Sequence, residues 1–290
     1  MKITGFTFIR NAILYDYPIV EAIRSILPIC DEFVVAVGAS EDDTLSLIKN
    51  MNSDKIRILQ TVWDDSLREG GRVLALETDK AFQAISEDTD WAFYIQGDEV
   101  IHEKYLPNIL SAMEKWKDNE QVDGLLFDYL HFYGSYDYVA FTSKWYQQEI
   151  RVIKNNKSIY SYRDAQGFRK NDDEKLWVKK VEAYVYHYGW VKPPEKQQLK
   201  QQTFNKLWHD DRWVDTHVAK GAQFDYSGID ALKRFEGTHP AVFQKRIAEK
   251  NWVFDFDISK NKISLKNKIK NILKKYLGLN LDYRNYRILR

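Results

Sequence analysis

The chain has 290 residues, of which 44% are hydrophobic and 14% aromatic; this suffices for one large folded domain or two closely joined lobes and excludes a disordered chain. The formal net charge is +1, but residues 259–290 contain seven Lys, three Arg and one Asp, a local balance of +9 that leaves −8 for residues 1–258. A main body with that charge is not a general nucleic-acid binder, so we expect no nucleic-acid partner.

The first half of the chain alternates predicted strands with predicted helices. Short apolar, strand-forming runs predict strands at residues 3–9, 33–37, 56–62 and 91–95. Apolar residues at three- and four-residue spacing predict helices at residues 11–27, 42–50 and 72–85. This alternation indicates an α/β fold with a largely parallel sheet.

The second half is more mixed. We expect helices at residues 106–116, 197–208 and 241–249, and strands at residues 122–133, 149–153 and 177–187 separated by polar loops. No internal repeat and no Pro- or Gly-rich linker marks a domain boundary.

The strand at residues 91–95 ends in Gln96, Gly97, Asp98 and Glu99. In α/β proteins the carboxyl ends of parallel strands form the edge where ligands bind, so these acids are candidates for holding a metal and a charged ligand. The alternative is an ordinary polar turn after a strand.

Several common signatures are absent. We find no GxGxxG after the first strand, no GxxxxGK[ST], no GxSxG and no HExxH. The usual marks of dinucleotide oxidoreductases, P-loop phosphotransferases, serine hydrolases and zinc proteases are therefore missing.

The order of motifs in the first 190 residues resembles that of a family 2 glycosyltransferase of the bacterial surface-polysaccharide type. The motifs are strand-RN-helix (6–13), strand-GASEDDT (33–44), GGR before a helix (70–72) and strand-QGDE (92–99). The resemblance implies a GT-A fold: a Rossmann-like, mostly parallel central sheet with helices on both faces. Residues 1–130 would form the nucleotide-sugar-binding half and residues 131–258 the acceptor-side half of the same domain.

The same resemblance implies the nucleotide contacts. Ser40, Asp42 and Thr44 match the family's Ser-x-Asp-x-Thr turn; Gln96 replaces the first acid of its Asp-x-Asp-type motif and Asp98 keeps the second. Gly38 lies where many relatives carry an acid that recognises the base, so the base stays open. The implied nucleotide-binding residues are Phe8, Arg10, Asn11, Ser40, Asp42, Arg72 and Gln96.

The chemistry of such a transfer explains the acidic edge. A nucleoside diphosphate leaves more easily when a hard, oxygen-liganded Mg²⁺ or Mn²⁺ neutralises its charge. The resemblance makes Asp98 and His187 the metal ligands; without it, His187 would be taken as a packed core histidine. Three roles are open for Glu99: a ligand, a residue that orients a neighbour, or the start of a helix.

An inverting transfer also needs a base for the acceptor hydroxyl. Residues 149–169 resemble the family segment in which an Arg-containing strand is followed by an acidic position, and Asp164 aligns best with that acid. Asp172, Asp173 and Glu174 compete for the role, and a solvated acidic loop is their other interpretation.

The predicted function is transfer of a hexose from a nucleotide diphosphate sugar to a hydroxyl of a glycan or lipid-linked glycan, with inversion. Two alternatives belong to other classes: a metal-dependent nucleotidyltransferase or pyrophosphatase, and a non-catalytic sugar- or nucleotide-binding protein. Gln96, in place of a motif acid, motivates the second alternative.

The basic C-terminal tail, residues 259–290, can form an amphipathic helix over residues 263–279. Such a helix fits an anionic membrane surface, and packing of its apolar face on the enzyme is the alternative. No apolar run approaches about 18 residues, and a single Cys30 fits a reducing compartment. We therefore expect a cytoplasmic protein, with the inner face of the membrane as the place of any peripheral contact.

Overall fold

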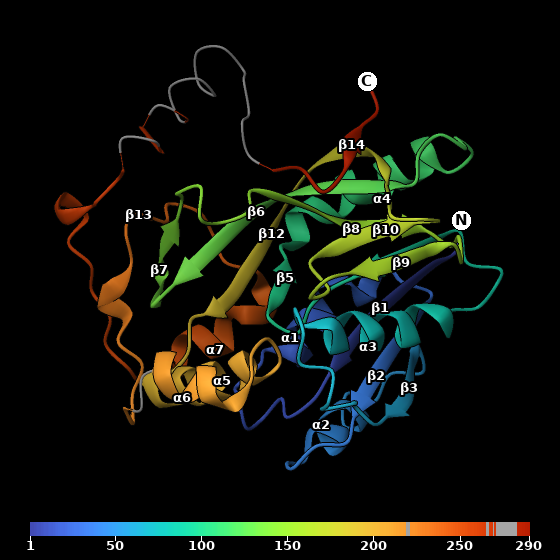
Figure 1. The fold of residues 1–290 in the computed structure, drawn as a ribbon. Coiled ribbons are helices and arrows are strands. Elements are labelled where there is room, and N and C mark those ends of the chain that lie inside the picture. Colours follow the sequence, from blue (N-terminus) through green and yellow to red (C-terminus); the bar gives the residue numbers. More distant parts are fainter. Residues whose placement is uncertain (219–220, 265–266, 269, 271–282) are drawn as a thin grey trace.

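The computed structural model describes residues 1–218, 221–264, 267–268, 270 and 283–290. Its strands and helices confirm the predicted α/β class (Figure 1). In the first half, four parallel strands pair in the order β4-β1-β2-β3. Their bounds are Ile3–Ile9 (β1), Glu32–Gly38 (β2), Ile56–Thr61 (β3) and Trp91–Tyr94 (β4).

The same sheet continues into the second half with mixed directions, so that eleven strands of the described ranges belong to it. β8 pairs antiparallel with β4 and with β6, whereas the long β12 runs parallel to β6 and antiparallel to β5. The bounds are Glu99–Ile101 (β5), Gly124–Tyr133 (β6), Ser135–Ala140 (β7), Gln148–Lys154 (β8), Trp177–Trp190 (β12), Leu232–Arg234 (β13) and Arg287–Ile288 (β14).

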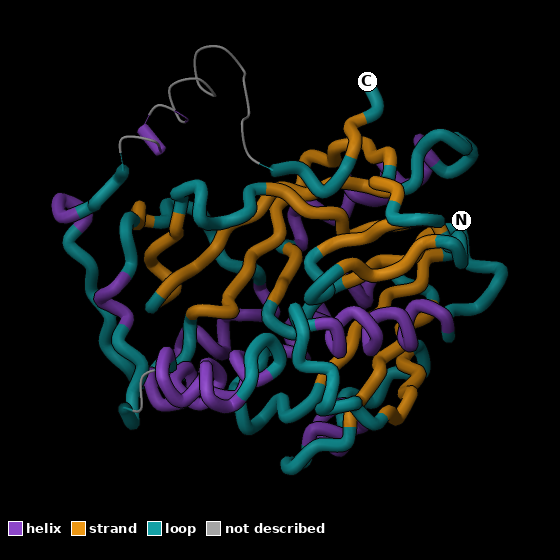
Figure 2. Tube along the Cα trace, in the orientation of Figure 1, coloured by secondary structure: helices purple, strands orange, loops and turns teal. Residues whose placement is uncertain are grey.

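Helices cover both faces of the parallel part (Figure 2). On one face lie α1 (Ile19–Ile26), α2 (Thr44–Lys49) and α4 (Leu106–Trp116). The other face is covered by α3 (Arg72–Gln83) and by a small antiparallel sheet of β9 (Ile159–Tyr162), β10 (Gly167–Lys170) and β11 (Glu174–Lys175). The strands are apolar on both sides because both sides are buried.

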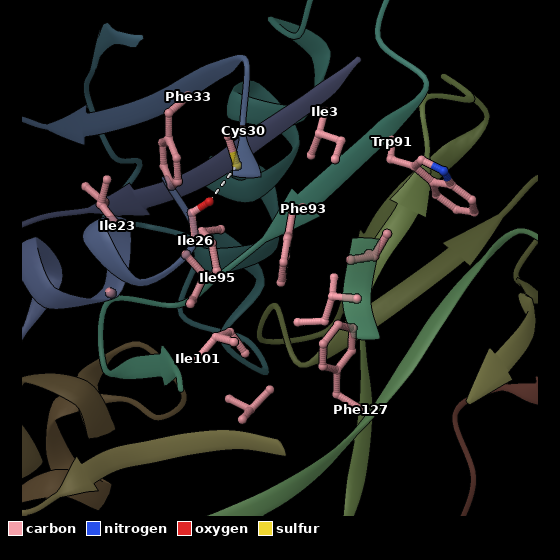
Figure 3. Packing of buried hydrophobic residues seen from close by; sticks show 14 of the residues in the cluster. Ile3, Ile23, Ile26, Cys30, Phe33, Trp91, Phe93, Ile95, Ile101 and Phe127 are labelled. Carbon is pink, nitrogen blue, oxygen red and sulfur yellow. Dashed lines mark hydrogen bonds between the residues drawn. The ribbon is translucent and has the colours of Figure 1, made fainter. Parts of the chain in front are cut away.

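Alternate residues of each strand separate into the two cores. In β2, Phe33 packs on the α1 side while Val34 packs on the α3 side. Figure 3 shows the first core, where Phe33, Trp91 and Cys30 lie among the isoleucines of α1 and its neighbours. The Cys30 thiol donates to the Ile26 carbonyl, and burial raises the pKa of this thiol to about 12, so it stays protonated.

The helix predicted for residues 11–27 is wrong over its first half. Residues 11–17 form turns, with Asn11 at φ 55° and Asp16 at φ 51°, and α1 begins only after Pro18. Backbone N–H groups in these turns donate to side chains of the second strand's loop: Leu14 to Asp42 at 2.7 Å and Ala12 to the Thr44 hydroxyl at 2.7 Å. These tertiary hydrogen bonds replace the helical ones that the apolar spacing favours.

The remaining helices follow the last long strand. They are α5 (Pro194–Lys206), α6 (Asp211–His217) and α7 (Gln244–Ala248). Most of the predicted tail helix, residues 263–279, falls outside the described residues; beyond it, β14 pairs in parallel with β12. Among the helices that the structure describes, none has the length and apolarity needed to cross a membrane. The boundary near residue 130 stays a prediction, and one sheet runs through both halves.

Candidate active site

A cavity of about 790 Å³ opens at the carboxyl ends of β1 and β4, the edge at which the sequence predicts a ligand. Its wall combines residues that follow β1 and β4 with residues from β12, α5 and the turn between β9 and β10. Seven of the ten predicted site residues line it, namely Phe8, Arg10, Asn11, Gln96, Asp98, Asp164 and His187.

Asp98 lies in the wall with only 8% of its surface exposed. Lys200 of α5 donates to Asp98 Oδ2 at 3.0 Å and to the Gly189 carbonyl at 3.1 Å. Burial by itself would raise the pKa of Asp98, but the positive charge of Lys200 outweighs this effect and lowers the pKa below its usual range. The carboxylate is therefore ionised, and one of its oxygens already has a cationic partner.

His187 is held by a chain of hydrogen bonds that defines its tautomer. His131, its neighbour on β6, has Nε2 at 2.7 Å from the Tyr146 carbonyl, so this nitrogen carries the proton and donates. His131 Nδ1 must then accept, and its partner at 3.1 Å is His187 Nδ1, which donates. Burial lowers the pKa of both histidines and so favours their neutral forms; in this form His187 carries its proton on Nδ1 and presents the lone pair of Nε2.

That lone pair faces the other oxygen of Asp98, with 3.7 Å between His187 Nε2 and Asp98 Oδ1. Two acceptors that face one another without a proton between them make a place for a cation. Gly189 leaves the space open, since a Cβ there would lie 2.7 Å from Asp98 Oδ2 and 2.8 Å from His187 Nε2. Pairing of β12 with β6 is irregular between His187 and Trp190, as is common beside functional sites.

As metal ligands, Asp98 Oδ1 and His187 Nε2 fit Mg²⁺ or Mn²⁺, which proteins often hold by one or two side chains while phosphates and water complete the coordination shell. In the described ranges no group of three or more His, Cys, Asp or Glu could form an all-protein cage.

The contacts of Glu99 favour the orienting role among its three open interpretations. It begins β5, a strand and not a helix, and is completely buried. Arg151 donates to both oxygens of the Glu99 carboxylate, from Nε to Oε2 at 2.8 Å and from Nη2 to Oε1 at 2.7 Å. The Tyr129 hydroxyl and the Gln96 backbone N–H also donate to it. With its oxygens occupied, Glu99 fixes the backbone just before Asp98.

Asp164 lies in a strained turn of the cavity wall. Its two neighbours, Arg163 and Ala165, have φ angles of 56° and 63°, a backbone region that side chains rarely adopt and that clusters at functional sites. The Gln96 side-chain amide donates to the Ala165 carbonyl at 3.0 Å, so Gln96 holds this turn. Burial raises the pKa of Asp164.

The GGR motif supports the same turn from the other side. Gly71, at φ 70°, lies so close that a Cβ would be 2.8 Å from Asp164 Cβ and 3.2 Å from the Trp208 ring. The competing acids Asp172, Asp173 and Glu174 are exposed residues of the β10–β11 hairpin and do not line the cavity.

The end of the cavity next to β1 is aromatic and cationic. Phe8 packs on Trp63 with ring centroids 5.7 Å apart, and the Arg10 guanidinium lies 5.5 Å from the Trp63 ring. Arg10 also donates to both carboxylate oxygens of Asp65, from Nη1 to Oδ1 at 2.6 Å and from Nη2 to Oδ2 at 3.3 Å. A Cβ at Gly38 would come within 2.4 Å of the Trp63 indole nitrogen, so any larger residue there would require Trp63 to move.

Three residues predicted to contact the nucleotide, Ser40, Asp42 and Arg72, are not part of the cavity wall. Ser40 accepts the Asn11 backbone N–H at 3.1 Å, and Asp42 binds the N–H groups of Leu14 and Thr44, so both tie the first two loops together. Arg72 is exposed and borders a separate small pocket. Their nucleotide contacts stay predictions.

Tryptophans line the remaining wall with donors that have no protein partner. The indole nitrogens of Trp63, Trp145 and Trp208 are buried, and none has a hydrogen-bond partner in the described part of the chain. Buried unpaired donors are costly, and a ligand rich in hydroxyl and carbonyl oxygens would satisfy them.

Sequence reasoning missed Lys200, Trp63 and the partner role of His131. Lys200 and Trp63 reach the cavity through tertiary packing and lie in no motif. His131 and His187 pair in register on parallel β6 and β12, a pairing that spacing in the sequence does not show.

The sequence matches no protein-family model and no curated protein. Among solved structures, S. aureus TarS in complex with UDP is 15% identical over 70% of this chain and 64% of that chain, with a TM-score of 0.40. Glucosyl-3-phosphoglycerate synthase from Mycobacterium tuberculosis in complex with Mn²⁺, UDP-glucose and glycerol 3-phosphate is 20% identical over 45% of this chain and 44% of that chain, with a TM-score of 0.31. Each match thus spans less than two thirds of the solved chain, 64% of the TarS chain and 44% of the synthase chain.

Proposed function

We propose that this chain is a GT-A-type, family 2-like glycosyltransferase that moves a hexose from a nucleoside diphosphate sugar to an acceptor hydroxyl. The observation that carries the proposal is the composition of one cavity. It joins a cation site at Asp98 and His187, a buried acid at Asp164, and an aromatic wall with unpaired indole donors. A volume of about 790 Å³ is adequate for a nucleotide sugar.

Asp98 Oδ1 and His187 Nε2 would hold Mg²⁺ or Mn²⁺, which neutralises the negative charge that develops on the leaving diphosphate. His131 keeps the proton of His187 on Nδ1, away from the cation. Glu99 and Arg151 fix the backbone from which Asp98 projects.

Asp164 is the proposed general base. The acceptor oxygen attacks the anomeric carbon, its proton passes to the Asp164 carboxylate, and the bond from that carbon to the diphosphate oxygen breaks with its electron pair going to the diphosphate. A raised pKa makes a carboxylate a better proton acceptor. Attack from the face opposite the leaving group inverts the anomeric centre.

The proposed binding region for the nucleobase and ribose is formed by Phe8, Arg10, Asn11 and Trp63. The acceptor would lie against Trp145 and Trp208, because indole faces stack on sugars and indole N–H groups donate to hydroxyls. A glycan or lipid-linked glycan acceptor fits this wall, and a role in polysaccharide synthesis at the inner face of the membrane stays a proposal.

Stabilisation by ligands tests the proposal without knowledge of the acceptor. A panel of nucleoside diphosphate sugars and free nucleotides, each with and without Mn²⁺, begins with UDP and UDP-glucose. A ligand at about 100 times its dissociation constant adds about 2.7 kcal/mol to the free energy of unfolding, which a thermal shift detects. We expect a Mn²⁺-dependent shift with one sugar nucleotide; folded protein that no sugar nucleotide stabilises would contradict the proposal.

Gly189→Ala tests the cation site. The added methyl group would lie under 3 Å from both Asp98 and His187, so we expect Mn²⁺ affinity to fall about 10- to 100-fold while the chain still folds. Gly228→Ala is the matched control, because a Cβ at Gly228 meets nothing within 4 Å. Titration of Mn²⁺ with UDP present measures both variants; equal affinities in the two would place the cation elsewhere.

A further inference from the structure

Lys200 is a cation built into the proposed metal site. Its ammonium lies 3.0 Å from Asp98 Oδ2 and 3.1 Å from the Gly189 carbonyl, and 4.9 Å from the centre of the Tyr17 ring. Lys200 is only 9% exposed, so these contacts are screened little by solvent. The ammonium thus does for Asp98 what a divalent cation would do: it neutralises a buried carboxylate.

The two cations cannot both bind this carboxylate easily. A divalent ion between Asp98 Oδ1 and His187 Nε2 would share one carboxylate group with the ammonium on Oδ2, and the two positive charges would repel each other at short range. Lys192 is also buried nearby, but its Nζ donates to the Asp16 carbonyl and burial lowers its pKa well below the usual value, so the competition at Asp98 rests on Lys200. Binding of one cation therefore weakens binding of the other.

The helix α5, which carries Lys200, packs in a way that allows the ammonium to leave Asp98. The buried side chains of α5 are all polar, namely Gln197, Gln198 and Lys200. Neither polar atom of the Gln197 amide has a hydrogen-bond partner in the described part of the chain. Phe204 of α5 is partly buried against the core on the α3 side, and the Asp98–Lys200 pair adds to this contact in holding α5 against the cavity.

We propose that Lys200 and a divalent cation compete as counter-ions of Asp98, so that the metal binds more tightly once the ammonium has moved away from the carboxylate. The inference rests on the metal site of the proposed function. It follows that the apparent affinity for metal is reduced by the fraction of molecules in which the pair is closed. A pair that is closed about nine times in ten weakens metal binding about tenfold.

The test is direct measurement of Mn²⁺ binding by electron paramagnetic resonance of the free ion, with no turnover involved. Lys200→Met removes the charge and keeps the aliphatic stem, and Lys200→Gln keeps a hydrogen-bond donor in case the first variant does not fold. Lys196→Met is the matched control on the same helix, since Lys196 donates to the Leu14 carbonyl and does not reach Asp98.

Both Lys200 variants are expected to bind Mn²⁺ at least about tenfold more tightly than the unmodified chain and Lys196→Met. Adding Asp98→Asn should abolish this gain. Equal or weaker binding in the Lys200 variants, with Mn²⁺ still bound at Asp98 in the unmodified chain, would overturn the competition and leave the proposed transferase standing. If neither the unmodified chain nor a folded Lys200 variant binds Mn²⁺, with or without UDP, the metal site itself is wrong.

Discussion

Asp98→Asn is expected to lower kcat by about 10³-fold. The substitution removes the negative charge that would hold the metal opposite His187 Nε2, 3.7 Å away. Charge stabilisation of a leaving diphosphate contributes several kcal/mol, and about 4 kcal/mol corresponds to a thousandfold in rate. Donor turnover measured at saturating Mn²⁺ checks the prediction.

Two variants separate this effect from a loss of stability. Asp98→Asn leaves the Lys200 ammonium buried without a counter-ion, which costs about 3 to 5 kcal/mol of folding free energy when one partner of a buried pair is removed. The double variant Asp98→Asn, Lys200→Met should recover stability and stay inactive. Asp128→Asn is the control: Asp128 also pairs with a lysine, Lys180, at 2.8 Å, but lies outside the cavity wall. An Asp98→Asn enzyme with near-normal kcat would remove Asp98 from the mechanism.

Asp164→Asn is expected to lower kcat by about 10² to 10⁴-fold while the donor still binds with its normal dissociation constant. An amide cannot take the proton of the acceptor hydroxyl, yet it is nearly the same size as the carboxylate and keeps the turn between Arg163 and Ala165 intact. Measurement of kcat together with donor affinity, the latter by thermal shift, distinguishes loss of the general base from loss of donor binding.

The competing acids are the controls for this prediction. Asp172→Asn and Asp173→Asn change exposed residues of the β10–β11 hairpin, so both should leave kcat within about twofold, in line with the small effects of surface substitutions. Loss of activity in either variant with Asp164→Asn active would move the base to the hairpin.

The parallel part of the fold could be predicted because its strands are buried on both faces. Runs such as 33–37 and 91–95 are continuously apolar, a pattern with few alternatives, and the observed β2 and β4 contain or nearly match them. The helix at 106–116 also agrees with α4. Where local periodicity and burial point to the same element, the sequence alone is informative.

Local pattern failed where distant groups supply the hydrogen bonds. Residues 11–17 carry helical spacing, but Asp42 and Thr44 capture their backbone N–H groups. The short strands of the second half, among them β7 and β13, were not predicted, because they pair with partners whose positions no local pattern gives.

The candidate site could be predicted only in part for the same reason. Asp98 follows a buried strand, so its sequence neighbours mark it, whereas Asp164 was implied by the family resemblance among several competing acids. Lys200 comes from a polar helix 102 positions after Asp98, and only the folded chain brings the two within 3.0 Å. The roles of the predicted site residues stay predictions until the variants are measured.

The most direct test of the account is to identify which bond of a bound nucleoside diphosphate sugar the chain breaks. Phosphorus NMR of the donor that stabilises the protein, incubated with Mn²⁺ and with water as the only acceptor, distinguishes the products. We expect a nucleoside diphosphate and free sugar, because a transferase breaks the bond between the anomeric carbon and the diphosphate oxygen. A nucleoside monophosphate with sugar 1-phosphate would instead indicate a pyrophosphatase, and a bound donor that stays intact even with glycan acceptors added would indicate a binding protein; either result would contradict the account.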